Sequence, residues 1–143
     1  MVQLKVRAYI IRENSGHREI LVFSEPEFPD LPLQLPGGTV EPGEPLLAAL
    51  GREVFEETGR EIFGPYDFQF QETIVHPVSK DLFSENVFVC NFSGECESGW
   101  DHRVTGSGED HNFLFRYSWI PIELAFEELA GWMGDHLKKV LNN

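Results

Sequence analysis

The chain has 143 residues, which is the length of one compact domain with no room for a second. Hydrophobic residues make up 41% and charged residues 24%, an ordinary globular composition that argues against disorder. Its 24 acidic and 11 basic residues give a net charge of −13, and because so acidic a surface repels polyanions, we expect no binding to polymeric nucleic acid.

The cysteines and the apolar runs exclude further classes. Two cysteines, Cys90 and Cys96, are too few for a disulfide framework or a thiolate zinc site, which favours a reducing cytoplasm. The N-terminus lacks a signal-peptide core, and no apolar run approaches the roughly 20 residues of a membrane span. We therefore expect a cytoplasmic protein that does not contact membranes. A homodimer is compatible with the sequence, which carries no signal for oligomeric state.

The first predicted elements form a hairpin. Apolar and polar residues alternate over 2–10, the pattern of a half-buried strand, and a turn at 14–16 leads to a partner strand at 19–24. Prolines make 25–32 an irregular loop, and 33–35 form a short strand that ends at a proline and two glycines.

A helix is predicted over residues 45–58. Pro45 suits its first position, and Gly59 suits the left-handed residue that follows its end. Gly51 lies inside it, where we expect close packing of the helix against a sheet to explain the missing side chain. The apolar stripe of this helix consists of Leu46, Leu47, Leu50 and Val54.

The C-terminal half alternates strands with loops before it ends in helices. Residues 67–75 and 85–92 predict antiparallel strands, and 93–111, rich in Gly, Ser and Asp, predict a long loop. Residues 112–120 predict another strand, and 121–141 predict one or two helices interrupted by glycines.

Three glutamates share one face of the predicted helix. Glu53, Glu56 and Glu57 are separated by three and four residues, and the last two lie in the final turn, where the helix dipole disfavours anions. Arg52 offsets only part of this repulsion. A hard divalent cation, Mg²⁺ or Mn²⁺, is the natural neutralising partner because these ions prefer carboxylate oxygens and bridge them to phosphates.

Residues 38–60 resemble the Nudix box, whose pattern is G-x5-E-x7-R-E-U-x-E-E-x-G-U, with U a bulky aliphatic residue. Only Arg60 departs from it, because the family has an aliphatic residue there. The departure affects local packing and no metal ligand. The matching residues are Gly38, Glu44, Arg52, Glu53, Val54, Glu56, Glu57 and Gly59.

The resemblance implies both a fold and an activity. The fold would be α+β, an α-β-α sandwich with a mixed β-sheet between helices. The activity would be metal-dependent hydrolysis of a nucleoside diphosphate linked to another group. The family's glutamates, here Glu53, Glu56 and Glu57, would hold the metal. Arg52 would orient the carboxylates, and Gly38 would shape the loop.

Further candidates lie around the box. Gly37 and Gly38 would offer backbone N–H groups to phosphate, with a plain turn as the alternative. Trp100 is the aromatic that we expect to meet a ligand, because it lies alone in a polar loop. Three histidines lack metal-ligand spacing, so we expect structural or surface roles for His76, His102 and His111.

A second source of carboxylates is needed, because one helix covers only one side of a metal cluster. Glu109 is a candidate general base and Asp110 a candidate metal ligand; the alternative is a solvated pair in a Gly-rich turn. Glu95 and Glu97 compete with them. Glu53 is the alternative base.

The sequence leaves the substrate open. We favour a nucleoside triphosphate or a related small nucleotide. Alternatives are an ADP-ribose or dinucleotide pyrophosphatase and a catalytically inactive Nudix-like domain that senses a nucleotide. Pro77 is near the position where ADP-ribose members carry a proline, but His76-Pro77 is more simply a kink that ends a strand. The lack of a tyrosine in this region disfavours dinucleoside polyphosphates.

Overall fold

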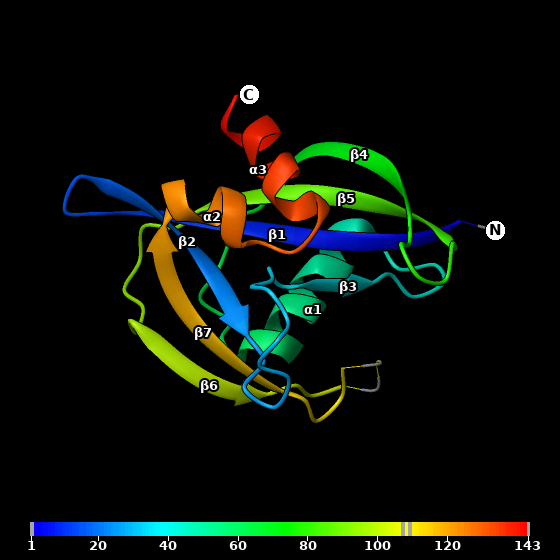
Figure 1. The fold of residues 1–143 in the computed structure, drawn as a ribbon, viewed down its shortest axis with the longest axis horizontal. Coiled ribbons are helices and arrows are strands. Elements are labelled where there is room, and N and C mark those ends of the chain that lie inside the picture. The colour runs from blue at the N-terminus through cyan, green and yellow to red at the C-terminus, as the bar shows by residue number, and fades with distance from the viewer. Residues whose placement is uncertain (1, 107, 109, 143) are drawn as a thin grey trace.

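The computed structural model describes residues 2–106, 108 and 110–142. One mixed sheet of seven strands is covered by helices on both faces, which confirms the predicted α-β-α sandwich (Figure 1). Within the described residues, no helix is long and apolar enough to cross a membrane. The elements are β1 (Gln3–Asn14), β2 (His17–Ser24), β3 (Gly37–Thr39), α1 (Leu46–Thr58), β4 (Asp67–Val75), β5 (Leu82–Asn91), β6 (Gly99–Arg103), β7 (Leu114–Pro121), α2 (Ile122–Glu128) and α3 (Trp132–Leu141).

Strand β1 is the centre of the sheet. The order is β4-β5-β1-β2-β7-β6, with β3 also paired to β1. The predicted hairpin is confirmed: β1 and β2 pair antiparallel, and Ser15 and Gly16 both have positive φ, as a two-residue turn requires. β4 and β5 pair antiparallel as predicted, whereas β5 also runs parallel to β1. The mixed sheet arises from that parallel pair.

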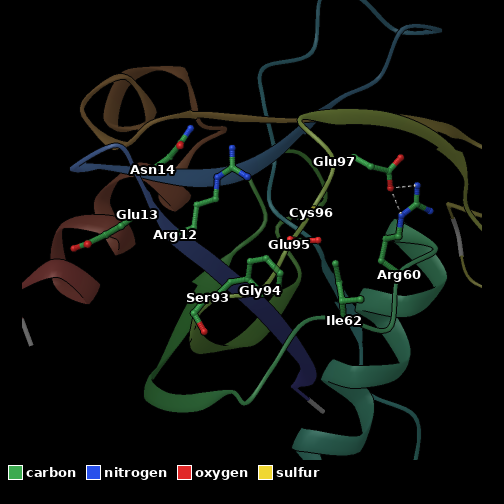
Figure 2. A pocket seen from close by; sticks show the side chains of 11 residues that line it. Arg12, Glu13, Asn14, Arg60, Ile62, Ser93, Gly94, Glu95, Cys96 and Glu97 are labelled. Atoms are coloured by element: carbon green, nitrogen blue, oxygen red, sulfur yellow. Dashed lines mark hydrogen bonds and ion pairs between the residues drawn. The ribbon is translucent and has the colours of Figure 1, made fainter.

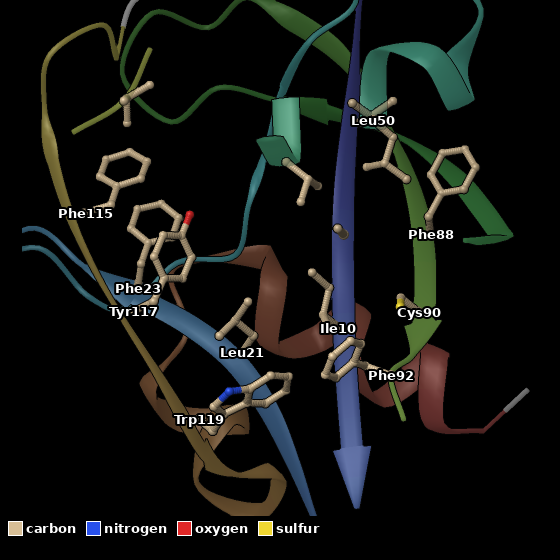
Figure 3. Close-up of a cluster of buried hydrophobic side chains, with 14 of the residues drawn as sticks. Ile10, Leu21, Phe23, Leu50, Phe88, Cys90, Phe92, Phe115, Tyr117 and Trp119 are labelled. Atoms are coloured by element: carbon tan, nitrogen blue, oxygen red, sulfur yellow. The ribbon is translucent and has the colours of Figure 1, made fainter. Parts of the chain in front are cut away.

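Helix α1 packs on one face of the sheet. Leu50 and Val54 are buried in an aromatic-rich core (Figure 3), and burying each contributes roughly 1.5–3 kcal/mol. The stripe was predicted wrongly at Leu47, which is 57% exposed. Gly59 ends the helix as predicted, with φ of 71° and its N–H donated to the carbonyl of Phe55 at 2.9 Å.

Helices α2 and α3 cover the opposite face with a second core. Tyr9 and Ile11 of β1 point into it, while Ile10 between them points toward α1. The Tyr9 hydroxyl donates to the carbonyl of Met133 in α3 at 2.9 Å. The alternating side chains of β1 therefore join both layers of the sandwich.

Three local predictions are wrong. The 93–111 segment is not one loop, because β6 lies within it and pairs with β7. Residues 33 and 34 make only isolated bridges, and the strand in this region is β3 itself. Gly51 does not pack against the sheet: a Cβ there would meet nothing within 4 Å.

Candidate active site

The box glutamates line a pocket of about 90 Å³ beside the start of β1. Glu53, Glu56 and Glu57 enter it from α1, and Asp110 enters from the connection between β6 and β7. The structure thus brings together four of the carboxylates singled out in the sequence. Glu109, the other predicted loop residue, lies outside the described residues.

Arg52 organises the carboxylates at the rim of this pocket. Its guanidinium donates to both oxygens of Glu44, at 2.8 and 2.9 Å, and to the carbonyl of Thr39 at 3.1 Å. Its Nη1 also donates to the Oε1 atoms of Glu53 and Glu56, at 2.9 and 3.0 Å. One fixed cation therefore orients three acidic side chains, with the planar geometry that arginine supplies.

The pair between Arg52 and Glu44 is strongly charge-assisted. Hydrogen bonds from Arg52 lower the pKa of Glu44 to about 2, and a backbone N–H from Glu41 adds to the effect. Glu44 in turn raises the pKa of Arg52. Both groups stay charged at neutral pH, so the orienting cation is permanent.

Glu57 is the most deeply buried carboxylate of the pocket. Its Oε1 accepts a hydrogen bond from the backbone N–H of Gly37 at 3.0 Å, yet burial raises its pKa well above the usual value. Burial also raises the pKa of Glu53, against the opposing effect of Arg52. The expectation that the Gly37 N–H is available to phosphate is therefore wrong, because Glu57 already accepts it.

The glycines of the site permit close approach rather than a turn. Gly37 and Gly38 lie in β3 without positive φ. A Cβ on Gly38 would lie 2.3 Å from Oε2 of Glu53, and one on Gly37 would lie 2.2 Å from the carbonyl oxygen of Val6. Any larger residue would displace either a site carboxylate or β1, so the sequence needs glycine at both positions.

The chain is similar to known proteins in sequence and in fold. A family model described as NUDIX domain matches residues 2–140. The chain belongs to the NUDIX family. Curated proteins give no match to its sequence. Solved structures with a similar fold include Ap4A hydrolase from C. elegans (TM-score 0.69, 23% identity, 99% of this chain and 98% of that chain), the NUDIX domain of Shewanella oneidensis NrtR complexed with ADP ribose (0.75, 14%, 99% and 88%) and MutT protein from Methanosarcina mazei Go1 (0.69, 25%, 99% and 94%).

The donor set of this NUDIX chain fits a hard divalent cation. All four pocket carboxylates offer oxygen ligands, and an added cation would offset the burial that raises the pKa of Glu57. Among the described residues, however, no three metal-binding side chains already converge on one point. Arg52 and Gly37 hold the Oε1 atoms, so binding would require small side-chain rotations.

The sequence did not place Lys5 or His111 in the pocket. Lys5 lines the pocket because β1 pairs with β3, which places Lys5 opposite Thr39. His111 lines it from the β6–β7 connection, although the sequence analysis assigned it a structural or surface role. In the sequence, Lys5 is recognisable only as a residue on the polar face of the first strand. Nothing in the local sequence indicates that this strand lies beside the box residues.

Trp100 occupies a different place from the one expected. It lies in β6, is only 8% exposed, and stacks on Tyr117 with ring centroids 5.0 Å apart. Its indole N–H donates to the carbonyl of Thr58 at 2.8 Å. The prediction of a lone aromatic in a polar loop is wrong, and the structure gives Trp100 a packing position behind α1.

A larger hollow, about 740 Å³, lies at the other end of β1 (Figure 2). It includes Glu95 and Glu97, the competing carboxylates, and among the described residues it shares no lining residue with the pocket of the box glutamates. Its arginines are already paired: Arg60 with Glu97 at 2.8 Å and Arg12 with Glu19 at 2.9 Å. The smaller carboxylate pocket is therefore the better candidate active site despite its size.

Proposed function

We propose that this NUDIX chain is a divalent-metal-dependent hydrolase that cleaves the pyrophosphate linkage of a nucleoside diphosphate bearing another group. One observation carries the proposal: Glu53, Glu56, Glu57 and Asp110 surround a single pocket. Burial raises the pKa of Glu57 and Glu53, so this pocket disfavours its own anions until a cation enters. Mg²⁺ is the cation we expect, with Mn²⁺ as a substitute.

The residues of the site would have different roles in the reaction. A bound divalent ion would neutralise substrate phosphate charge and activate water. Arg52 keeps Glu53 and Glu56 directed toward the pocket by holding one oxygen of each. Lys5 lines the pocket, but its Nζ lies over the Phe83 ring, 5.1 Å from the centroid, so its side chain would have to turn to contact a phosphate of the substrate. Glu53 or the 109–110 pair would remove the proton from water.

We favour a nucleoside triphosphate or a related small nucleotide as the substrate. The similar fold of the E. coli dihydroneopterin triphosphate pyrophosphohydrolase (TM-score 0.70, 17% identity, 98% of this chain and 96% of that chain) supports a triphosphate substrate. The similar folds of an Ap4A hydrolase and of an ADP ribose complex keep dinucleotides and ADP-ribose as alternatives. The NrtR comparison also supports a second candidate function, a domain that binds a nucleotide without cleaving it.

A nucleotide panel separates these functions. Purified protein is incubated with nucleoside triphosphates, including oxidised ones, ADP-ribose and a dinucleoside polyphosphate, with Mg²⁺ or with EDTA. The proposal predicts hydrolysis that requires the metal and is abolished by Glu56→Gln and by Glu57→Gln. A nucleoside triphosphate would release pyrophosphate or phosphate, ADP-ribose would give AMP and ribose 5-phosphate, and a dinucleoside polyphosphate would give two nucleotides. Nucleotide binding without any product would support the sensor instead. A variant with near wild-type kcat at saturating Mg²⁺ would contradict the assignment of that glutamate.

A further inference from the structure

The C-terminal carbonyls of α1 are bound by side chains and backbone from the segment that contains β6. His102 Nε2 lies 3.1 Å from the carbonyl oxygen of Glu56, and the backbone N–H of Thr105 donates to the same oxygen at 3.0 Å. Trp100 donates to the carbonyl of Thr58. Because the acceptor is a carbonyl, the His102 contact requires a proton on Nε2. These donors satisfy carbonyls that a helix end leaves unpaired.

Two glycines let this segment approach the helix. A Cβ on Gly59 would lie 2.6 Å from Nδ1 of His102, so the glycine after α1 makes room for the imidazole. A Cβ on Gly106, whose φ is +89°, would lie 2.3 Å from Oε2 of Glu56. The backbone after β6 therefore packs directly on a carboxylate of the pocket, while His102 holds the carbonyl of the same residue.

Arg60, the position that departs from the Nudix pattern, also joins the end of α1 to the segment that contains β6. Its guanidinium lies over the Trp100 ring, 4.9 Å from the centroid, and pairs with Glu97 (Figure 2). An aliphatic residue would cover the indole by apolar contact alone, whereas the arginine also fixes the segment that leads into β6. The departure therefore lies at the junction between α1 and β6.

We propose that His102 is a positioning residue, which aligns the β6–β7 connection with α1 so that Asp110 faces Glu53 and Glu57 across the pocket. Asp110 follows His102 by eight residues, and the bonds of His102 and Thr105 to the Glu56 carbonyl attach the segment that leads to Asp110 to α1. This inference rests on the proposed function, because it assumes that these carboxylates bind a divalent cation together. Loss of an outer partner of this kind typically weakens metal binding roughly 10- to 100-fold.

The test measures Mn²⁺ affinity by isothermal titration calorimetry, without any substrate. His102→Phe is expected to raise the Kd about tenfold. His102→Gln, whose amide can donate to the Glu56 carbonyl, is expected to restore most of the affinity. His102→Asn is too short to reach and should resemble His102→Phe, which keeps the test valid if the Phe variant fails to fold. His17→Phe, at an exposed position in β2, is the matched control and should bind like wild type.

A double-mutant cycle with Asp110→Asn distinguishes alignment from a general structural effect. If His102 acts through the position of Asp110, the Phe substitution should change Kd less than about twofold once Asp110 is neutral. A full tenfold effect in that background would overturn the proposal, and so would wild-type affinity in both His102→Phe and His102→Asn. Wild-type protein that binds no Mn²⁺ would overturn the proposed function as well, whereas metal-dependent hydrolysis with unaffected His102 variants would overturn this inference alone.

Discussion

Glu57 accepts a hydrogen bond from the backbone N–H of Gly37 at 3.0 Å, although its carboxylate is almost completely buried. One hydrogen bond does not replace the water that a carboxylate loses, so burial still raises its pKa well above the usual value. The same contact fixes α1 to β3 across 20 residues of sequence. The burial of Glu57 therefore comes at a cost to the stability of the metal-free protein.

The first prediction concerns that cost. The folded pKa of Glu57 is raised, so its protonated form favours folding at low pH, and this contribution is lost as the pH rises above the ordinary value of 4.5. Glu57→Gln should therefore stabilise the metal-free protein at pH 7.5, on the order of 1 kcal/mol, with a much smaller gain at pH 4.5. Urea unfolding in EDTA at both pH values measures the difference.

Glu56→Gln is the control for this experiment. Glu56 lies on the same helix face but pairs with Arg52, so its neutralisation should change stability by less than about 0.5 kcal/mol. A Glu57→Gln protein less stable than wild type at pH 7.5 would contradict a destabilising effect of the buried carboxylate.

The second prediction concerns the pair between Arg52 and Glu44. Its lowered pKa means that Glu44 stabilises the fold above pH 4.5 and loses this contribution as the pH falls toward 2. Glu44→Gln should cost about 1 kcal/mol at pH 7, and the difference from wild type should shrink in acid. Glu41, 4.0 Å from Arg52 and exposed, provides the matched control in Glu41→Gln. Equal losses in the two variants would contradict a specific role for Glu44.

The third prediction concerns Gly51. A Cβ at this helical position would meet nothing within 4 Å, so alanine should raise the free energy of unfolding by about 0.5–1 kcal/mol through helix propensity alone. Thermal unfolding of Gly51→Ala checks this, with the nucleotide-hydrolysis rate as a second readout. A destabilised variant would restore the expectation of close packing at this glycine.

The fourth prediction identifies the general base. kcat is measured against pH for Glu53→Gln, Glu109→Gln and Asp110→Asn. The variant that removes the base should lose the rise of kcat with pH and fall roughly 10²- to 10⁴-fold in rate. If both loop variants keep the wild-type profile and Glu53→Gln loses it, Glu53 is the base. Wild-type profiles in all three variants would place the base elsewhere.

The sequence predicted the parts of the site that depend on local spacing. The glutamates, Arg52 and the αL glycine Gly59 all lie within one helix and its end, where the 3.6-residue period fixes their relation. The convergence of Asp110 on this face was also predicted, from the need for ligands outside the helix. Asp110 lines the same pocket as the box glutamates, as expected, whereas its role as a metal ligand stays a prediction.

Features that depend on which segments become neighbours in the fold could not be predicted from the sequence. Lys5 enters the pocket only because β1 pairs with β3, and the Gly37 N–H is occupied only because α1 returns over that strand. Trp100 was misjudged because β6, a five-residue strand rich in charged and polar residues, resembles a loop. Non-local strand pairing leaves no periodic signal in so short a segment.

The most direct test of the account is the thermal stability of the metal-free protein on addition of Mg²⁺ or Mn²⁺. An ion at 100 times its Kd stabilises the native state by about 2.7 kcal/mol, which corresponds to a rise in Tm of roughly 5–10 °C for a chain of this size. The account predicts such a rise for wild type at millimolar metal, and its loss in Glu57→Gln. A wild-type Tm that is the same in EDTA, Mg²⁺ and Mn²⁺ would contradict a divalent-cation site at these carboxylates.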